Sequence, residues 1–385
     1  MKSELMYSRI LKLPLQDKSS IFLFGPRGTG KTSWIKSYLS DSLYLDLLDF
    51  STYNSLAADP SRLENMIPPN YDKFVVIDEV QRVPELLNEV HRLIEARGFK
   101  FLLTGSSARS LRRKGVNLLA GRALTYHMHP LTAQELGDDF NLAQAIQYGL
   151  LPTVIHHPDP KKYLESYVQT YLREEVVQEG LTRNIGGFSR FLEVASFSQG
   201  NILNFSEIAR ETSLNRSAVA DYFTILEDLL LAQRIDVFTQ RAKRKMVVHQ
   251  KFYFFDSGIY KILRPTGLLD TKEETDGAAL ETLFLQSLAA INDYLEFGYK
   301  IYFWRTSSGA EVDFILYGPR GLHAFEIKRS SRVDSKALKG LKEFKLDYPE
   351  AKLHFVYLGS NKAYYDQITA IPLEIALKDL PTLIG

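Results

Sequence analysis

The sequence predicts a multidomain protein with an α/β domain at residues 1–135, a central helical module at 136–270 and a second α/β domain at 271–385. Three observations support this division. The chain has 385 residues, which suits two to three domains of ordinary size. Short apolar runs alternate with amphipathic segments near the N-terminus, a pattern typical of buried parallel strands. Helical periodicity then dominates until a long helix, from about residue 277, leads into further strands.

The composition is that of an ordinary globular protein and excludes several kinds of site. The 47 Lys and Arg residues nearly balance the 46 Asp and Glu residues, so the net charge of +1 does not mark a nucleic-acid binder. With no cysteine, the chain has no disulfide, thiolate zinc site or cysteine nucleophile. No apolar run approaches the ~18 residues that span a bilayer, and charges interrupt the opening segment MKSELMYSRILKLPL. We therefore expect a soluble, cytoplasmic protein without a membrane partner.

Four apolar runs in the first domain predict its strands. They are IFLF at 21–24, LYLDLL at 43–48, FVVI at 74–77 and FLL at 101–103. Amphipathic segments such as SWIKSYLS and LLNEVHRLIEA lie between these runs and predict helices. In a parallel sheet of this kind, ligands bind at the carboxyl ends of the strands, so functional residues are expected directly after each run.

A glycine-rich loop follows the first predicted strand and opens a helical stretch. Its residues match GxxxxGK[ST] and are Gly25, Pro26, Arg27, Gly28, Thr29, Gly30, Lys31 and Thr32. The glycines let backbone N–H groups turn toward phosphate oxygens, and the helix N-terminus adds its positive dipole end. Lys31 is predicted to reach the β- and γ-phosphates, and the Thr32 hydroxyl to hold Mg²⁺. A chance glycine-rich turn is the alternative, but the strand–loop–helix context favours a bound nucleotide.

An acidic pair follows the strand FVVI. Asp78 emerges at the carboxyl end of a buried strand, where it is predicted to hold the magnesium shell. Glu79 comes next and is the expected general base that polarises the attacking water. The alternative is that both carboxylates only cap the following helix. The pair indicates hydrolysis of the nucleotide as well as its binding.

The strand FLLTGSS ends in polar residues, and arginines follow it. Thr104 or Ser106 is predicted to lie between the γ-phosphate and Glu79 and to sense the bound nucleotide, with a helix cap as the alternative. One arginine is expected to reach the γ-phosphate of a neighbouring subunit and stabilise transition-state charge. Arg122 is the first choice, although a solvated helix face also explains most of these arginines. The candidates are Arg109, Arg112, Arg113 and Arg122.

Residues 20–130 resemble an AAA+ P-loop ATPase module of the kind found in bacterial and archaeal ATP-binding proteins. The motifs that carry the resemblance are GPRGTGKT, VVIDEVQRVPELL, LLTGSSAR and LAGR, in that order. The resemblance implies hydrolysis of ATP, with Mg²⁺, by subunits that assemble into a ring or filament. A homo-oligomer, with a hexamer as the expected form, follows from the resemblance and not from the composition.

The central module contains a helix–turn–helix pattern. In residues 205–235, apolar positions recur at spacings that pack two crossed helices around a turn near Ser213. Strand patterns at 235–240 and 251–256 then predict a hairpin, which is the order of a winged helix. Acidic residues on the second helix oppose DNA binding, and a protein-interaction module is the alternative. Contacts with DNA phosphates are predicted for Arg216, Ser217, Tyr222, Arg241, Lys243, Arg244 and Lys245.

Three acidic residues and a lysine form a second candidate site. Glu281 lies in the helix AALETLFLQSLAAI and Asp313 in the strand EVDFIL, while Glu326 and Lys328 end the strand LHAFEIK. Strand alternation puts Glu326 and Lys328 on one side, and a turn at 317–321 lets Asp313 pair across from them. Carboxylate oxygens suit Mg²⁺, and the lysine is expected to orient or help deprotonate a water aimed at phosphorus.

Residues 277–360 resemble the PD-(D/E)xK nuclease superfamily, with its restriction-endonuclease-like α/β fold, and a C-terminal domain of uncharacterised function that commonly follows such ATPase modules. The resemblance implies metal ligation by Glu281, Asp313 and Glu326 and catalysis by Lys328, although Val312 stands where the superfamily pattern has proline. A fold that has lost cleavage is the alternative. A basic helix stripe that follows a DNA backbone, or else a solvated surface, is predicted for Lys336, Lys339, Lys342 and Lys345.

Together these patterns predict a Mg²⁺-dependent ATPase that acts on DNA by translocation or remodelling, with branched DNA among its substrates. Its C-terminal domain is expected to bind DNA and either cut it or only grip it. The main alternative is a nucleotide-gated switch in regulation or defence whose C-terminal domain binds a protein partner. A third interpretation makes the chain an ATP-driven remodeller of other proteins. Stimulation of ATP turnover by DNA or by a protein would distinguish these functions.

Overall fold

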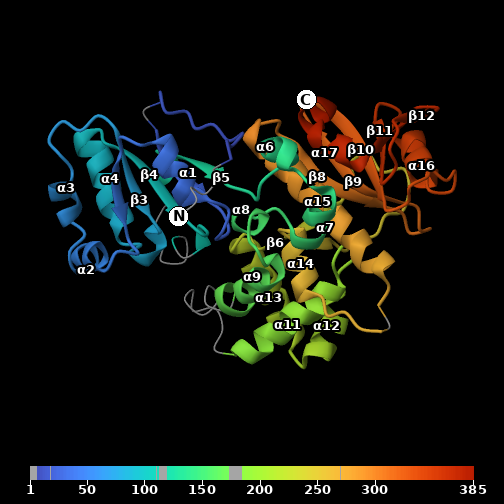
Figure 1. The fold of residues 1–385 in the computed structure, drawn as a ribbon, viewed down its shortest axis with the longest axis horizontal. Helices are drawn as coiled ribbons and strands as arrows, with labels where there is room; N and C mark the ends of the chain where they lie inside the picture. The colour runs from blue at the N-terminus through green and yellow to red at the C-terminus, as the bar shows by residue number, and fades with distance from the viewer. Residues whose placement is uncertain (1–6, 18, 110, 112–118, 173–183, 269) are drawn as a thin grey trace. The chain divides into compact units, whose positions relative to one another are not determined.

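The structure is a computed structural model that describes residues 7–17, 19–109, 111, 119–172, 184–268 and 270–385 (Figure 1). The chain divides into two compact units. The first contains residues 1–129 and 228–230, and the second contains residues 130–227 and 231–385. The second unit therefore includes nearly all of the predicted central module together with the predicted C-terminal domain.

The first unit is built on a five-stranded parallel sheet in the order β2–β3–β4–β1–β5. Its strands are β1 (Ser20–Phe24), β2 (Leu43–Asp46), β3 (Phe74–Asp78), β4 (Lys100–Gly105) and β5 (Ala123–His127). Its helices are α1 (Lys31–Tyr38), α2 (Phe50–Ala58), α3 (Arg62–Met66) and α4 (Leu86–Arg97), with 3-10 turns at Val80–Arg82 and Leu119–Gly121. All four predicted strands are confirmed, and the parallel arrangement with them.

Alternation along the strands gives this sheet two buried faces. Phe101 and Leu103 pack in a core with residues of α2, α3 and α4. Leu102 lies between them and is equally buried, as expected for a parallel sheet that is covered on both sides. Asp78 and Thr104 follow the same alternation onto the face opposite that core. Because β4 lies between β1 and β3, Thr104 is placed between the phosphate loop and Asp78.

The second unit begins with helices. They are α6 (Ala133–Leu136), α7 (Leu142–Tyr148), α8 (Pro152–Ile155), α9 (Pro160–Ser166), α11 (Ile185–Phe197), α12 (Phe205–Thr212) and α13 (Arg216–Asp228), with a 3-10 turn at Gly137–Asp139 and a π turn at Tyr167–Leu172. The predicted helix pair is present as α12 and α13, and Ser213 between them has a left-handed φ of 56°. Tyr222 is buried against the rings of Phe188 and Phe191, so its predicted contact with a DNA phosphate is wrong.

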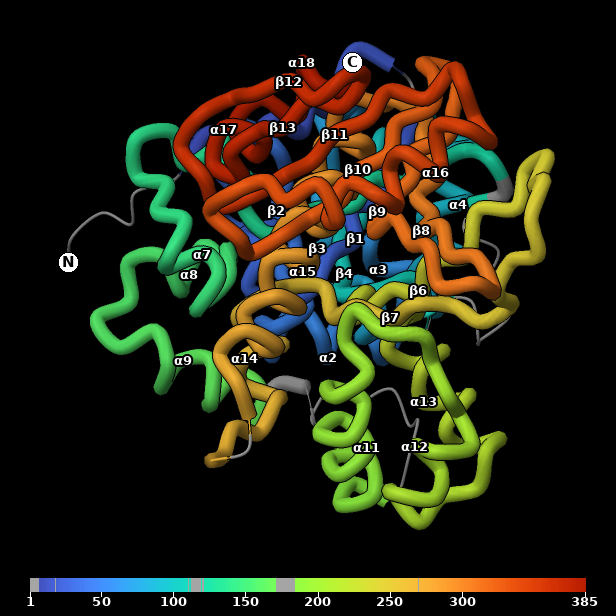
Figure 2. The backbone as a smooth tube through the Cα atoms, turned by 90° about the vertical axis from the view of Figure 1, so that its right-hand side faces the viewer, coloured from blue at the N-terminus to red at the C-terminus, as the bar shows by residue number. Residues whose placement is uncertain are grey.

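An eight-stranded mixed sheet forms the rest of the second unit, in the order β12–β13–β11–β10–β9–β8–β6–β7 (Figure 2). Its strands are β6 (Ala232–Val237), β7 (Lys251–Phe254), β8 (Lys300–Arg305), β9 (Glu311–Gly318), β10 (Gly321–Lys328), β11 (Lys352–Tyr357), β12 (Ala363–Tyr365) and β13 (Ile368–Pro372). The helices that accompany it are α14 (Ser257–Leu263), α15 (Lys272–Tyr294), α16 (Lys339–Asp347), α17 (Leu373–Lys378) and α18 (Leu380–Ile384).

The helices α15 and α16 cover opposite faces of the sheet. Residues of α16, such as Phe344, share a core with Trp304 and Phe355. On α15, Phe284 packs its ring against those of Phe314 and Phe325. Of the acidic candidate residues, Glu281 is part of α15. Glu326 alternates with Phe325, which faces α15, and so lies on the side of β10 where Ala324 packs with α16.

The hairpin that the sequence predicts as a wing belongs to this sheet instead. β6 and β7 pair antiparallel, and β6 pairs parallel with β8 through Asp236–Tyr302 and Val237–Phe303. The loop between β6 and β7 is also tied to the β8 end, since the Ser307 N–H donates to the Lys245 carbonyl at 2.9 Å. The difference arises because β6–β8 pairing spans more than 60 residues of sequence, which no local pattern reveals.

Several of the basic side chains predicted to contact DNA already have partners within the second unit, among them Lys339 with Glu343 and Lys342 with Asp366. Arg244 pairs with Glu343 and Asp347 of α16. Lys345 donates to the Ala351 carbonyl at 2.7 Å. The helix α16 begins at Lys339, so the predicted stripe of four lysines is not one continuous helical face.

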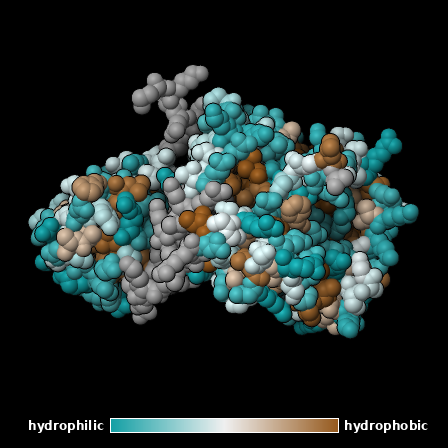
Figure 3. Space-filling model, turned by 90° about the horizontal axis from the view of Figure 1, so that it is seen from below, coloured by the Kyte–Doolittle hydropathy of each residue, from teal (hydrophilic) through white to brown (hydrophobic). Residues whose placement is uncertain are grey.

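Within the described ranges, no helix is both long enough and apolar enough to cross a membrane. Polar residues cover most of the face seen in Figure 3, and hydrophobic residues are scattered among them.

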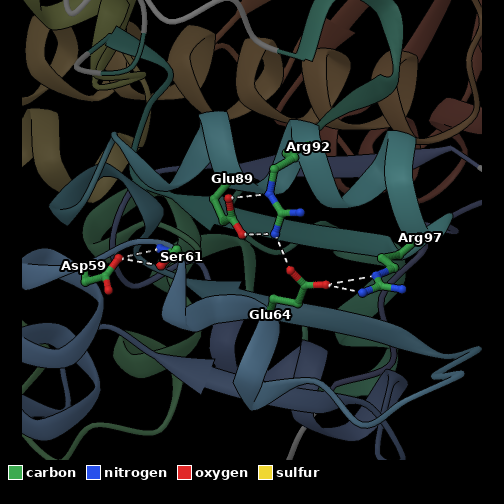
Figure 4. Close-up of polar contacts among 6 residues, drawn as sticks. All are labelled: Asp59, Ser61, Glu64, Glu89, Arg92 and Arg97. Carbon is green, nitrogen blue, oxygen red and sulfur yellow. Dashed lines mark hydrogen bonds and ion pairs between the residues drawn. The ribbon is translucent and has the colours of Figure 1, made fainter.

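On the first unit, an ion-pair network joins α3 to α4 (Figure 4). Glu64 accepts from both Arg92 and Arg97, and Arg92 also pairs with Glu89 at 2.6 Å. None of the predicted site residues takes part in these ion pairs.

Candidate functional site

The phosphate loop lies between β1 and α1 and has the backbone shape that its motif predicts. Gly28 and Gly30 have φ angles of 83° and 89°, which glycine adopts without strain. A Cβ at Gly25 would lie 2.4 Å from the carbonyl oxygen of Met128, so this position also requires glycine. Lys31 is buried, and its ammonium group donates to the Gly25 carbonyl at 2.5 Å. The loop is therefore curled with its lysine held against its own backbone.

The carboxylate of Asp78 is held by three hydroxyl groups. Thr32 donates to Oδ2 at 2.8 Å, Tyr44 donates to the same oxygen, and Thr104 donates to Oδ1. Asp78 is only 1% exposed. Burial, together with the nearby Asp78 carboxylate, raises the pKa of Tyr44 well above its usual value, so its hydroxyl remains a donor. The structure thus brings Thr32, Asp78 and Thr104 together and adds Tyr44, which the sequence analysis missed although it lies in the predicted strand LYLDLL.

Glu79 follows β3 in a left-handed conformation, with φ 61° and ψ 44°. This conformation is uncommon for a residue other than glycine and costs energy. The N–H of Glu79 donates to the Thr104 hydroxyl oxygen at 3.2 Å. Its carboxylate accepts from the side-chain amide of Gln81, a partner that the sequence analysis did not identify. The backbone of Glu79 is thereby tied to the group of residues around Asp78.

Ser106 and Arg122 lie at different ends of the sheet. Ser106 is buried directly after β4. Arg122 directly precedes β5, which runs parallel to β1, so it lies at the amino ends of these strands, whereas the loop follows the carboxyl end of β1. Its guanidinium group pairs with Glu95 of α4. Arg122 therefore has no role toward the loop of its own chain. Arg112 and Arg113 lie outside the described residues.

The second candidate site is formed where β7, β9, β10 and α15 come together. Asp313 and Glu326 are 4% and 6% exposed. The ammonium group of Lys328 lies 2.5 Å from Glu326 Oε1 and 3.8 Å from Asp313 Oδ2. The same Asp313 oxygen accepts from the Ile327 N–H at 2.8 Å. Glu326 and Lys328 therefore share one side of β10, as alternation predicts.

A β-bulge lies at Asp313. Tyr302 of β8 pairs with Ile315, whereas Trp304 pairs with Val312, so β9 contains one residue more than β8 in this stretch. Bulges of this kind re-aim a side chain and are frequent beside functional sites. The sequence gives no signal for it.

β7 supplies two further polar groups to this site. Lys251 is 2% exposed, and its ammonium group lies 2.5 Å from Glu311 Oε1 and 3.7 Å from Asp313 Oδ1. The Tyr253 hydroxyl donates to Glu281 Oε2 at 2.8 Å. Sequence reasoning missed both residues because it assigned β7 to the predicted wing. A lysine at the start of an otherwise apolar strand, KFYF, was the available signal.

Burial and the charges of neighbouring carboxylates shift the pKa values of the residues in this site. Burial, and next the charge of Asp313, raises the pKa of Glu281 to about 7 and that of Glu326 to about 8. The charge of Asp313 also raises the pKa of Lys328 above its usual value. Burial lowers the pKa of Lys251, but the surrounding carboxylates outweigh burial and raise it overall. Both lysines are thus positively charged, and the carboxylates outnumber them.

The donor chemistry of this site fits a divalent cation, but the side chains are not gathered around one point. Within the described part of the chain, no three His, Asp or Glu side chains converge in an arrangement that could hold a metal ion. Instead, Lys328 bridges Glu326 and Asp313, and Lys251 bridges Asp313 and Glu311. One buried oxygen, Glu326 Oε2, has no hydrogen-bond partner among these residues. That orphaned oxygen and the excess of carboxylates are what a hard cation would satisfy.

Comparison with protein families divides the chain into three segments. Residues 17–137 match an AAA domain family, residues 139–271 match a domain of unknown function (DUF8612), and residues 276–376 match another (DUF4143). The first match covers the parallel sheet, the phosphate loop and Asp78. The N-terminal segment is therefore a P-loop domain of the AAA type, a class that binds nucleotides. The two other families assign no activity to the acidic site.

Individual relatives match along nearly the whole chain. An uncharacterized protein of Mycobacterium tuberculosis is 24% identical over 373 residues, covering 94% of this chain and 82% of that protein. An uncharacterized protein of Methanocaldococcus jannaschii is 23% identical over 417 residues, covering 99% and 91%. A solved structure of the Aeropyrum pernix ORC1 protein in complex with DNA covers 64% of this chain and 86% of that one, at 13% identity. Its TM-score of 0.30 is too low to support an argument.

Proposed function

We propose that this protein is a Mg²⁺-dependent ATPase of the AAA type that couples hydrolysis of ATP to translocation on DNA or remodelling of DNA, including branched DNA. The observation that carries the ATPase part is the Asp78 carboxylate, which is buried beside the phosphate loop and held by three hydroxyl groups. Such a carboxylate can share a magnesium shell with Thr32 without having to reorganise.

The residues of the first unit have separate tasks in this proposal. The loop backbone and Lys31 bind the β- and γ-phosphates, for which Lys31 exchanges its contact with the Gly25 carbonyl. Magnesium, when bound, neutralises charge that develops on the phosphate oxygens. Glu79 accepts a proton from the attacking water once its carboxylate leaves Gln81. Thr104 links Glu79 to Asp78 and reports which nucleotide is present, and Ser106, directly after β4, has the same task.

Arg122 completes this site only in an assembly. It lies at the opposite ends of the strands from the loop of its own chain, so any contact with a γ-phosphate is made to a neighbouring subunit. An arginine finger supplied in this way would complete the site only in a homo-oligomer, such as a hexamer. Release from Glu95 would accompany the contact.

We infer that the acidic site is nuclease-like and acts on the phosphodiester backbone of DNA. Asp313, Glu326 and Glu281 would hold Mg²⁺, and the bound ion would supply the acidity that activates a water for attack on phosphorus. Lys328 orients that water or takes part in its deprotonation. The exposed residues Lys243 and Lys245 favour DNA as the substrate, because their loop is hydrogen-bonded to the end of β8 beside Glu311.

ATP turnover of the full chain, with and without duplex, single-stranded and branched DNA, tests the first part. Strong stimulation by one form of DNA, which weakens as salt is raised and disappears in Glu79→Gln, is the expected result. Turnover that ignores every DNA would contradict the DNA-directed motor and favour the alternative, a nucleotide-gated switch that binds a protein partner.

Cleavage of plasmid DNA in Mg²⁺ tests the second part. Wild-type protein should nick the plasmid, while Glu326→Gln and Lys328→Ala should not. Glu374→Gln is a matched control, because Glu374 is exposed, lies outside the acidic site and pairs with Lys378 on α17. Intact plasmid with the wild-type chain would reduce the C-terminal site to DNA binding.

A further inference from the structure

Lys251 is the most deeply buried lysine of the acidic site, and it comes from outside the segment in which that site was predicted. Its side chain is 3% exposed, and its ammonium group bridges Glu311 and Asp313. It belongs to β7, within the family segment 139–271, whereas both carboxylates belong to the segment 276–376. The site is therefore assembled from two segments that sequence comparison separates.

The surroundings of Lys251 are those of a cation rather than of a solvent-exposed lysine. Glu281, Glu311, Asp313 and Glu326 contribute four carboxylates, and Lys251 and Lys328 are the two buried or half-buried ammonium groups that contact them. Arg305 also lies 3.4 Å from Glu311 and, like Lys328, is 39% exposed. When all four carboxylates are ionised, they outnumber these three cationic side chains. A bound cation would compensate the remaining negative charge.

Lys251 and Lys328 differ in their exposure and in the carboxylate oxygens that they contact. Lys328 is 39% exposed and contacts Glu326, the residue with the orphaned oxygen. Lys251 is enclosed and contacts the other side of Asp313, at Oδ1 instead of Oδ2. The orphaned oxygen of Glu326 is therefore a free donor for a cation on one side of Asp313, while the ammonium group of Lys251 already fills the Glu311 side.

We propose that Lys251 occupies the position of a second cation, so that this site takes one divalent ion per chain and not two. This inference rests on the proposed nuclease-like function for the identity of the remaining cation. It makes Lys251 a positioning residue: its ammonium group holds Glu311 and Asp313 together at the β-bulge. It also makes the predicted central module an obligatory part of the C-terminal site.

The test counts Mn²⁺ bound to the nucleotide-free full chain, with free Mn²⁺ measured by electron paramagnetic resonance. Wild type should bind one Mn²⁺ at this site, and Lys251→Met should bind one more, because the vacated position between two carboxylates then takes the ion. Lys251→Arg keeps the charge and should match wild type. Lys261→Met is the matched control, because Lys261 is 11% exposed and pairs with Asp276 outside the site.

The outcomes separate this inference from the proposed function. Equal Mn²⁺ counts for Lys251→Met and wild type would overturn the role of Lys251 and leave the nuclease-like proposal intact. Another outcome is that wild type binds no Mn²⁺ while Lys251→Met binds one ion. That result would contradict the nuclease-like proposal, but it would still show that Lys251 occupies the position of a cation. No Mn²⁺ with either protein would overturn both.

A second variant covers the case in which Lys251→Met does not fold. Lys251→Met combined with Glu311→Gln removes one charge of each sign, so the double variant should fold and bind the wild-type number of Mn²⁺ ions. Urea unfolding should show the double variant to be more stable than Lys251→Met alone. If both variants unfold equally, Lys251 serves packing and the inference is wrong.

Discussion

Single side chains determine how the carboxylate of Asp78 is presented to a ligand. Thr104 is central among them, because its hydroxyl donates to Asp78 and its oxygen accepts from the Glu79 N–H. Thr104→Val keeps the shape of the side chain and removes both contacts. We expect the rate of ATP hydrolysis to fall roughly 10- to 100-fold, as is typical when a group that orients a metal ligand is lost.

Thr104→Ser separates this effect from a packing defect, because it restores the hydroxyl and loses only a methyl group. Steady-state turnover and nucleotide affinity of both variants are the measurements. Activity of Thr104→Val equal to that of Thr104→Ser would show that the hydroxyl has no part in hydrolysis.

The residues of the phosphate site were predictable to different degrees. Lys31 and Thr32 follow from a local motif, and Asp78 and Thr104 follow from the rule that parallel strands end at one edge. The contact of Tyr44 with Asp78 could not be predicted, because it depends on β2 lying next to β3, and periodicity does not give the order of strands. Lys251 could not be predicted either, because the sequence pattern places its strand in the central module and not beside the strands of the acidic site.

At the scale of elements, one buried cap joins α14 to the turn before α8. Asp256 is fully buried and accepts from the N–H groups of Gly258, Ile259 and Leu150. Asp256→Ala would leave these donors unpaired in the interior. We expect it to lower the free energy of unfolding by about 2–4 kcal/mol, measured by urea denaturation.

Asp159→Ala provides the comparison, because Asp159 caps α9 at an exposed position. Its loss should cost clearly less, since water can reach the freed donors. Equal losses for the two variants would mean that burial of the Asp256 cap adds nothing.

A pair of buried imidazoles between β10 and β11 makes stability depend on pH. His323 and His354 lie 3.3 Å apart between Nδ1 and Nε2, and burial lowers their pKa values to about 4 and about 3. The folded chain therefore holds them neutral, whereas the unfolded chain protonates them below about pH 6.5. Stability is full above that pH and is lost as pH falls toward the lowered values.

Between pH 7 and pH 5, His354 alone should cost about 2 kcal/mol of unfolding free energy. His354→Phe, which can keep the stack on Phe325, should make the decline shallower. His249→Gln, at an exposed position, should leave it unchanged. The measurement is the urea midpoint of each protein across this pH range. Parallel curves for wild type, His354→Phe and His249→Gln would contradict the assignment of this pH dependence to His354.

The sequence predicted helix pairs and strands better than it predicted their partners. The helices α12 and α13 and the strand β7 lie where their patterns indicate, and β6 begins three residues before the predicted strand at 235–240 and ends three residues before its end. The error was to join them into one winged helix, because an antiparallel pair after two helices looks the same whether or not a third strand continues the sheet. The parallel pairing of β6 with β8 depends on contacts far apart in sequence.

The whole molecule contains separate hydrophobic cores in its two units. We therefore expect two thermal transitions in a calorimetric scan, of which only the one from the first unit responds to nucleotide. With Mg²⁺ and ATP at 100 times the dissociation constant, binding stabilises that unit by about 2.7 kcal/mol and raises its transition by several degrees. Lys31→Ala should abolish the shift, and an equal shift of both transitions would contradict independent unfolding.

The pairing of β6 with β8 also limits how this chain can be divided. A fragment cut to the third family segment, from residue 276, would begin after β6 and β7 and would leave β8 as a bare sheet edge with unpaired N–H and C=O groups. Such an edge invites aggregation, so expression of that fragment alone is expected to give insoluble protein. Recombination between genes at this boundary would likewise transfer an incomplete sheet, and an exchangeable unit must therefore carry both segments.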